Sequence, residues 1–169
     1  TYPNLRFFTA NKFTFWSIKL NFITVNSPNF MSLLSSDVKA KIVNTATLVK
    51  YEAGQVVYNR GDTDTYLTIV KQGLLKVGTF GVDGDFLHLA NFGPGQWLGA
   101  QMLLTELPRM QDCIAVTPSE LYQIQVSKFM PLFNNEPEIA RALLKTCVIR
   151  LLASTEFIDD LRRLPLQVR

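Results

Sequence analysis

Histidine and cysteine are scarce in this sequence, and their scarcity excludes several classes of protein. The chain of 169 residues contains one histidine, His88, and two cysteines, Cys113 and Cys147. A histidine-rich metal centre or a cupin-like metal enzyme needs several such ligands, and an iron–sulfur sensor usually needs four cysteines. Two cysteines so far apart also predict no disulfide framework and no zinc site. We therefore predict no metal site, and only haem ligation through His88 or a cysteine stays open.

Long apolar runs are absent as well. No stretch approaches the roughly 20 apolar residues that a membrane-spanning helix needs. The N-terminus lacks the basic-then-apolar order and the cleavage site of a secretory signal. The content of 47% hydrophobic and 18% charged residues is typical of a globular domain. We expect a cytoplasmic protein without a membrane partner.

Acidic residues are missing from residues 1–36, whose only charged side chains are Arg6, Lys12 and Lys19. The remaining residues carry 14 basic and 14 acidic side chains, so the net charge of +3 comes from this first stretch. A DNA-binding domain usually shows a basic face. Because the main part of the chain is balanced, we predict that it does not bind DNA by itself.

The residue arrangements that carry catalysis are also lacking. No pair of carboxylates, Ser–His–Asp set or activated cysteine emerges from the pattern. Asp62 and Asp64, and likewise Asp83 and Asp85, stand in short polar stretches beside glycine, where aspartate commonly forms turns. We therefore predict a protein that is not an enzyme.

Aromatic side chains, by contrast, crowd residues 1–26. The seven are Tyr2, Phe7, Phe8, Phe13, Phe15, Trp16 and Phe22. We interpret residues 1–26 as an N-terminal extension, or as sequence upstream of the domain, whose order the pattern leaves open. A strand at about 13–25 is the alternative, because apolar residues alternate there. If these aromatics are ordered, they must cover another surface.

From residue 27 the pattern is first helical and then β. Ser27 and Pro28 supply a cap and a first-turn proline for a helix over 27–46, which carries an apolar stripe. Short β segments separated by glycine turns follow at 47–51, 55–58, 65–71, 74–80, 85–92, 111–117 and 120–126. Asp83 and Gly84 predict a tight hairpin turn. Many short strands at even spacing predict a barrel or a jelly-roll-like sandwich, so the fold class is mainly β with flanking helices.

The last part of the chain predicts helices over 127–134 and from Pro137 to Arg163. Along the longer helix, residues at heptad-like spacing form a seam of Ala140, Leu144, Cys147, Leu151, Ser154, Ile158 and Leu161. A neighbouring stripe consists of Leu143, Val148, Leu152 and Thr155. Two stripes predict two contacts, one with the β domain and one with a second helix; one broad core-facing stripe is the alternative. We predict a homodimer through Leu144, Cys147, Leu151, Ile158 and Leu161.

Three stretches carry a family resemblance. "YEAGQVVYNRGDTDTYLTIVKQGLLKVG" (51–78) resembles the opening motif of the cyclic-nucleotide-binding fold, through Gly54, Val57, Gly61, Asp62, Tyr66, Leu67, Ile69, Gly73 and Val77. "FGPGQWLGAQMLLTELPR" (92–109) is similar to the phosphate-binding cassette of that fold. "FIDDLRRLPLQVR" (157–169) resembles the hinge before the helix-turn-helix domain of CRP/FNR-type bacterial transcription regulators. The resemblance covers about residues 28–169 and implies a cyclic-nucleotide-binding β roll, a double-stranded jelly-roll-like fold.

The resemblance implies a ligand site in the cassette, with Gly99, Ala100, Gln101, Arg109 and Met110 among its residues. Arg109 matches the arginine that pairs with the cyclic phosphate, and Gly99 the glycine that lets the backbone come close. Ala100 replaces the glutamate that holds the ribose hydroxyl, and Met110 replaces a hydroxyl residue. Two lost hydrogen bonds, at about 0.5–1.5 kcal/mol each, weaken binding roughly ten- to a few hundredfold. No cofactor is therefore certain: a cyclic nucleotide is disfavoured by Ala100 and Met110 but stays open.

Three residues have a second interpretation. Ser154 and Thr155 match the hydroxyl pair that in the catabolite activator meets the adenine across the dimer. The alternative, which we favour, is that small hydroxyl side chains ease close packing of helices. For Arg109 the alternative is a surface arginine that bonds carbonyl groups or the nearby Asp112.

The resemblance implies the sensor and dimerisation domain of a CRP/FNR-like bacterial transcription regulator, with a degenerate pocket for a different effector or none. Its parts are the extension (1–26), the β roll (27–134), the dimerisation helix (135–163) and the start of a hinge (164–169). DNA is then a partner only through a helix-turn-helix domain that this sequence lacks. The alternative is a stand-alone or fused cyclic-nucleotide-binding module that controls an enzyme or a scaffold.

Overall fold

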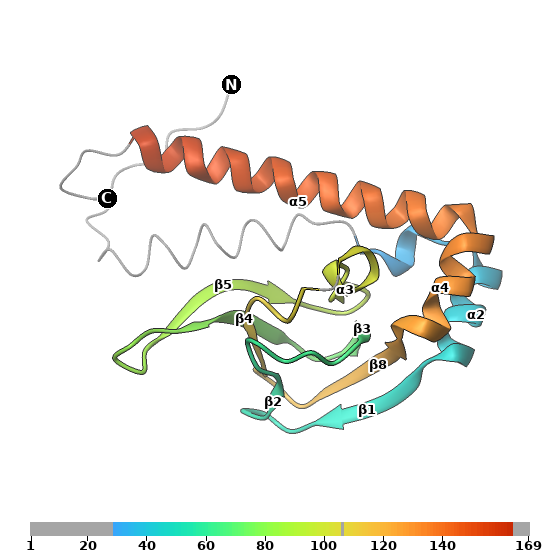
Figure 1. Cartoon of the computed structure of the whole chain (residues 1–169), viewed down its shortest axis with the longest axis horizontal. Coiled ribbons are helices and arrows are strands. Elements are labelled where there is room, and N and C mark those ends of the chain that lie inside the picture. The colour runs from blue at the N-terminus through green and yellow to red at the C-terminus, as the bar shows by residue number, and fades with distance from the viewer. Residues whose placement is uncertain (1–28, 106, 164–169) are drawn as a thin grey trace.

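Two antiparallel sheets and a long helix form the described part of this computed structural model, residues 29–105 and 107–163 (Figure 1). The strands are β1 (Thr47–Tyr51), β2 (Val56–Tyr58), β3 (Tyr66–Gln72), β4 (Leu75–Phe80), β5 (Phe86–Phe92), β6 (Trp97–Leu98), β7 (Asp112–Ala115) and β8 (Ser119–Gln125). The helices are η1 (Met31–Leu33), α2 (Ser36–Thr45), α3 (Gln101–Leu104), α4 (Val126–Asn135) and α5 (Pro137–Arg163). The predicted fold class, a β roll flanked by helices with a long C-terminal helix, is confirmed.

The two sheets each contain four strands, in the orders β1-β8-β3-β6 and β2-β7-β4-β5. All their pairs are antiparallel, and non-consecutive strands lie side by side. Pairing of β3 with β6 places the part of the cassette after β6, from Gly99 onward, beside the loop that precedes β3. The sheet order therefore joins the two sequence motifs in space.

The sequence predicts seven of the eight strands, with their ends within two residues of those observed. The hairpin between β4 and β5 turns at Asp83 and Gly84 as expected, with Gly84 at φ +82° and Gly81 N–H donating to Asp85 O at 2.8 Å. The strand that the pattern does not predict is β6. Its two residues, Trp97 and Leu98, are too few to show any alternation.

The continuous helix expected over 27–46 is wrong. Residues 31–33 form a single 3-10 turn, and a separate α-helix starts at Ser36. Ser35 lies in the β region at φ −63° and ψ 159°, and its hydroxyl accepts a hydrogen bond from the backbone N–H of Val38. Such an N-cap starts a new helix. The same hydroxyl donates to Glu138 of α5 at 2.6 Å, which ties the two helices together.

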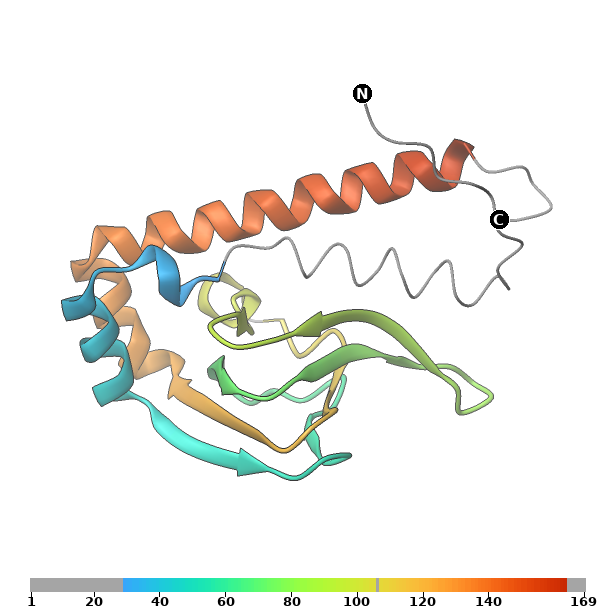
Figure 2. The ribbon, with the colours of Figure 1, turned by 180° about the vertical axis from the view of Figure 1, so that it is seen from behind.

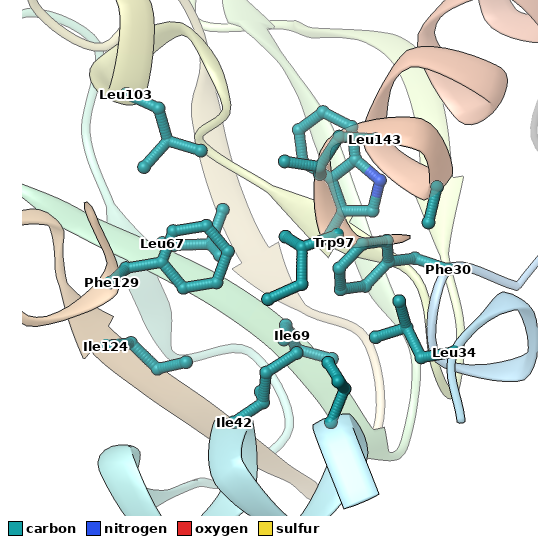
Figure 3. Packing of buried hydrophobic residues seen from close by; sticks show 13 residues of the cluster. Phe30, Leu34, Ile42, Leu67, Ile69, Trp97, Leu103, Ile124, Phe129 and Leu143 are labelled. Carbon is teal, nitrogen blue, oxygen red and sulfur yellow. The ribbon is translucent and has the colours of Figure 1, made fainter. Parts of the chain in front are cut away.

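The buried apolar residues form two clusters, one on each side of the sheet that contains β3. The larger cluster lies between this sheet and the helices (Figure 3), and includes Phe30, Leu34, Ile42, Leu67, Ile69, Trp97, Leu103, Ile124, Phe129, Ile139 and Leu143. The smaller cluster lies inside the roll and includes Val70, Leu75, Val77, Leu98, Cys113, Ala115 and Leu121. Alternation along β3 supplies both, because Leu67 and Ile69 face the helices and Val70 faces the roll.

Helix α5 runs across the molecule above the roll (Figures 1 and 2) and presents two different faces. The face toward the domain contains the buried residues Ile139, Ala142, Leu143 and Thr146. The opposite face is exposed and apolar. Of the second stripe predicted from the sequence, only Leu143 is buried, whereas Val148, Leu152 and Thr155 are exposed. The contact with the domain is therefore made by Leu143 together with Ile139, Ala142 and Thr146, and the rest of that stripe lies outside it.

Trp97 fastens α5 to β6. Its indole Nε1 donates to Thr146 Oγ1 at 2.8 Å, and that hydroxyl donates in turn to the carbonyl of Leu143, also at 2.8 Å. From the next turn of α5, Arg150 Nη2 donates to Trp97 O at 3.1 Å. The guanidinium of Arg150 also lies 4.6 Å from the centre of the Trp97 ring. The two-residue strand β6 is thus held by hydrogen bonds to α5 as well as by its pairing with β3.

Replacing Trp97 by Phe should lower the free energy of unfolding by about 1–2 kcal/mol, through the lost hydrogen bond and some lost packing. Thr146→Val should lower the free energy of unfolding less in the Trp97→Phe background than in the unchanged protein, because both substitutions remove the same hydrogen bond. Urea unfolding measures both effects. Phe80→Leu, on an exposed aromatic, is the control and should change stability by no more than about 0.5 kcal/mol. Equal losses at Trp97 and Phe80 would contradict the described link.

Several sequence predictions lie outside the described residues. These are the extension 1–26 with its strand at about 13–25, the helix start at Ser27 and Pro28, and the hinge 164–169. The side chain of Leu161 in the predicted seam also lies outside them.

Candidate functional site

The cassette (92–109) contains β6 and the glycine turn after it, and ends at Arg109, three residues before β7 starts. Gly99 has a φ of +87°, a left-handed conformation that residues with a Cβ atom rarely adopt. Helix α3 follows at once, and its buried residue Leu103 packs into the larger cluster. Upstream, Gly95 N–H donates to Val70 O at 2.7 Å, which fixes the turn before β6 to β3.

Arg109, at the end of the cassette, is buried, with 2% of its surface exposed. Its Nε and Nη2 donate to the two carboxylate oxygens of Asp64 at 3.1 and 2.8 Å. Nη2 also donates to the carbonyl of Tyr66 at 2.7 Å, and the guanidinium carbon lies 4.1 Å from the centre of the Tyr58 ring. A paired guanidinium and carboxylate of this geometry fix each other's orientation.

The alternative interpretation of Arg109 is correct about a bond to a carbonyl group, that of Tyr66, but wrong about a surface position and about Asp112. Asp112 is itself buried, and its carboxylate accepts a hydrogen bond from the backbone N–H of Arg60 at 2.8 Å. The prediction that Asp64 only forms a turn is also corrected. In the loop before β3 that role belongs to Asp62, whose carboxylate accepts from the backbone N–H of Asn59 at 2.8 Å.

Asp64 keeps Arg109 charged in a buried environment. Burial by itself lowers the pKa of Arg109, but the hydrogen bonds and negative charge of Asp64 outweigh it, so the pKa is raised. One nitrogen remains: Nη1 is buried and makes no hydrogen bond to any residue of the described ranges. A Cβ atom on Gly99 would lie 2.5 Å from this Nη1, so the orphan nitrogen lies directly beneath the glycine turn.

A cavity of about 160 Å³ lies beside the cassette. It is lined by Tyr58, Val77, Phe92, Trp97, Leu98, Gly99, Ala100, Gln101, Gln111 and Arg150. Of the predicted contacts, Gly99, Ala100 and Gln101 therefore face this space. Arg109 and Met110 are not among the residues that line it.

The charged side chain at this cavity comes from α5. Arg150 lies against two aromatic rings, with its guanidinium carbon 5.0 Å from the centre of Phe92 and 4.6 Å from that of Trp97. Burial lowers the pKa of Arg150 to about 10, so the guanidinium is still protonated at neutral pH. A positive charge is therefore present at the wall of the cavity.

The remaining predicted contacts point elsewhere. The side chain of Met110 is 50% exposed. Ser154 and Thr155 donate to carbonyls one turn earlier in their own helix, those of Arg150 and Leu151, at 2.9 and 3.0 Å. Such bonds are common for hydroxyl residues inside helices. Whether this pair meets a ligand across a dimer stays a prediction.

Sequence reasoning missed Asp64, Gln111 and Arg150 as site residues. Asp64 stands close to Gly61 in a polar stretch that looks like any turn. Gln111 is two residues beyond Arg109, just after the motif ends. For Arg150 a signal was present, because its position interrupts an apolar helix just before Leu151 and Leu152. A charged residue on the buried side of an amphipathic helix indicates a partner there.

Comparison with known proteins agrees with this geometry. The sequence model described as "Cyclic nucleotide-binding domain" matches residues 48–136, which is more than half of the chain and includes the whole cassette. The chain belongs to the cyclic nucleotide-binding domain family. The residue-level resemblance is thereby confirmed for the domain that contains the cavity.

Relatives of this cyclic nucleotide-binding domain differ widely in length. Lysophospholipase nte1 of Neurospora crassa is 30% identical over 119 residues, which are 70% of this chain and 8% of that protein. The cyclic AMP receptor protein of Thermus thermophilus is 28% identical over 101 residues, 60% of this chain and 47% of that protein. The chain thus spans less than a tenth of the first relative and about half of the second.

The fold is shared with a solved structure of a regulator. The crystal structure of Thermus thermophilus catabolite activator protein superposes with a TM-score of 0.70 at 23% identity. The match covers 80% of this chain and 63% of that one. At this identity the likeness shows the fold of the cyclic nucleotide-binding domain.

Three further observations concern the described residues of this domain. No group of three or more His, Cys, Asp or Glu side chains among them is placed to hold a metal ion. None of their helices is both long and apolar enough to cross a membrane. Cys113 is buried, and burial raises the pKa of its thiol to about 12, so it is not an activated nucleophile.

Proposed function

We propose that this domain is the ligand-sensing and dimerisation part of a cytoplasmic transcription regulator of the CRP/FNR type. The observation that carries the proposal is the position of Arg150. This residue belongs to α5, yet it lines the cavity together with Gly99, Ala100 and Gln101 of the cassette. A ligand in the cavity therefore contacts the long helix directly, and α5 leads toward the expected hinge at 164–169.

An anionic effector fits the charges at this place. Arg150 brings a protonated guanidinium to the wall, and guanidinium groups bind carboxylate and phosphate oxygens with paired hydrogen bonds. Arg109 contributes less than its motif suggests, because Asp64 already pairs with it and only Nη1 is left without a partner in the described ranges. The predicted arginine therefore mainly ties the end of the cassette to Asp64 and Tyr66. In this proposal Arg150, which lines the cavity, takes the larger role toward the anion.

The partner of α5 is, in this proposal, a second copy of the chain. Apolar side chains along the helix face away from the domain, and we define the exposed strip as Leu144, Val148, Leu151, Leu152 and Ile158. Leu144, Leu151 and Ile158 recur every seven residues, with Val148 and Leu152 between them, as in helices that pack side by side. The exposed thiol of Cys147 lies beside this strip. A helix pair about a two-fold axis would bury the strip and bring the two α5 helices into contact.

Cys147 provides a direct test of the helix pair. With Cys113 buried, Cys147 is the accessible thiol of the chain, and in a parallel pair the two copies lie close together. Mild oxidation at low protein concentration should convert most of the chain into a covalent dimer on a non-reducing gel. Cys147→Ser should run as a monomer on the same non-reducing gel. Cross-linking that rises in proportion to protein concentration, as random collisions do, would contradict the pair.

A second candidate is a regulatory module joined to an enzyme. It is favoured by the relative at 30% identity, which is named a lysophospholipase and is far longer than this chain. The two candidates differ in what the gene encodes beyond residue 169. A helix-turn-helix segment, with DNA binding by the full-length protein, supports the regulator. A catalytic domain before or after these residues refutes it in favour of the module.

A further inference from the structure

Gln101 and Gln111 bring two carboxamides to the wall of the cavity. Gln101 starts α3, and Gln111 directly precedes β7, so they approach from different segments. Both side chains are partly buried, and neither makes a hydrogen bond to another described residue. A carboxamide carries two donor hydrogens and an acceptor oxygen. The wall thus carries two carboxamides that can form hydrogen bonds to a polar ligand, because no described residue of the protein takes that place.

The size of the cavity limits that ligand. A space of about 160 Å³ is close to the cavity of about 150 Å³ that takes up benzene in an engineered protein, whereas pockets for drug-sized ligands measure about 300–1,000 Å³. A cyclic nucleotide combines a purine, a ribose and a phosphate, each comparable to benzene in bulk. A full nucleotide therefore does not fit within this space and would have to extend out of it.

Gln111 is one of the two lining glutamines, and both stand apart from the packed core. Among the lining residues, Gly99 and Ala100 have almost no side chain, whereas Trp97, Leu98 and Val77 belong to the buried clusters. Gln111 belongs to neither cluster and is held by no hydrogen bond within the described residues. Its amide occupies space beside the cassette without a structural role in the core.

We propose that Gln111 sets the size of the ligand, so that the cavity accepts a compact anion with a planar apolar body and excludes cyclic nucleotides. This inference rests on the proposed function, in which the cavity is the sensing site. Arg150 pairs with the anionic group, and the rings of Phe92 and Trp97, with Leu98, face the apolar body. Gln101 and Gln111 donate to further oxygen atoms of the ligand. Loss of the family's glutamate at Ala100 then follows, because no ribose hydroxyl needs an acceptor.

The test compares benzoate, benzamide and cyclic AMP as probes on four proteins. These are the unchanged chain, Gln111→Ala, Arg150→Gln and the control Gln72→Ala, which removes an exposed glutamine on β3 outside the cavity. Binding is followed by backbone amide NMR shifts, which detect weak complexes and show whether cassette residues respond. Thermal unfolding establishes that each variant is folded.

We expect the unchanged chain to bind benzoate at least about tenfold more tightly than cyclic AMP or the neutral benzamide. Gln111→Ala should gain about tenfold or more in affinity for cyclic AMP, while Gln72→Ala changes nothing. The size limit is overturned if the unchanged chain and Gln111→Ala bind cyclic AMP with equal affinity, or if neither protein binds it. It is also overturned if the unchanged chain prefers cyclic AMP to benzoate.

Arg150→Gln separates this inference from the function on which it rests. If that variant loses benzoate binding but Gln111→Ala leaves nucleotide affinity as it was, the sensing site stands and the role of Gln111 is refuted. If Arg150→Gln binds benzoate as well as the unchanged chain, the cavity is not the anion site and both proposals fall.

Discussion

Asp64→Ala should destabilise the protein by about 3 kcal/mol, which for a chain of this length lowers the melting temperature by about 6–12 °C. The substitution leaves the buried guanidinium of Arg109 with only a carbonyl, that of Tyr66, and the face of Tyr58. Removing one partner of a buried ion pair costs about 3–5 kcal/mol because the other charge stays uncompensated. Asp64 is 33% exposed, so water enters after the change and the lower end of that range applies.

Removing both partners should restore much of the loss. Met matches the unbranched stem of Arg as far as Nε and carries no charge, and buried ion pairs replaced by apolar side chains are often close to neutral in stability. Arg109→Met with Asp64→Ala should therefore be more stable than Asp64→Ala alone. Urea unfolding of the four proteins gives the coupling energy directly.

Asp62→Ala is the matched control for this pair. It removes a carboxylate two residues earlier that bonds an exposed backbone N–H, and it should cost about 1 kcal/mol. An Asp64→Ala variant that is no less stable than Asp62→Ala would show that Arg109 does not depend on its carboxylate. The pair would then be an exposed contact of little energetic value.

Leu151→Glu should convert the proposed dimer into a monomer. Leu151 is 66% exposed and lies at the middle of the strip, between Leu144 and Ile158. In a parallel helix pair the two copies of residue 151 face each other, so the change replaces an apolar contact by two like charges. A loss of about 3 kcal/mol or more weakens dimerisation by more than about a hundredfold.

The measurement is molar mass by light scattering across a range of concentrations. The mass should fall from twice the chain mass of 19.1 kDa to that of a single chain. Lys145→Glu is the control, because it places the same side chain on an exposed position of α5 outside the strip. A dimer that survives Leu151→Glu and is lost on Lys145→Glu would place the contact on another face of the helix.

The sequence was sufficient for those parts of the fold that repeat along the chain. Alternating apolar residues and glycine turns predict seven strands, and the periodic pattern predicts α5 from Pro137 to Arg163 as observed. The failures occur where one local contact decides. Ser35 divides the first helix because its hydroxyl caps Val38, and the apolar spacing on both sides carries no trace of that break.

The site was less predictable than the fold, for a physical reason. The glycine motif and Arg109 are contiguous patterns, and both are found where the motif places them. The partner of Arg109 is Asp64, 45 residues earlier, and they meet through the pairing of β3 with β6 and the backbone bonds of Arg109 to Gly61 and Asp62. Arg150 reaches the cavity because α5 lies across the roll, and no local pattern contains that packing.

The link at Trp97 has a thermodynamic consequence for the whole domain. The indole nitrogen of Trp97 donates to Thr146, and its carbonyl accepts from Arg150. The glycine turn of the cassette, at Gly99, follows two residues later. If occupation of the cavity changes how strongly α5 holds its partner, then pairing of α5 changes the affinity of the cavity by the same factor, because coupling between two binding equilibria is reciprocal. The concentration of the protein itself then acts as an effector, and a ligand affinity measured on the monomer differs from that of the dimer.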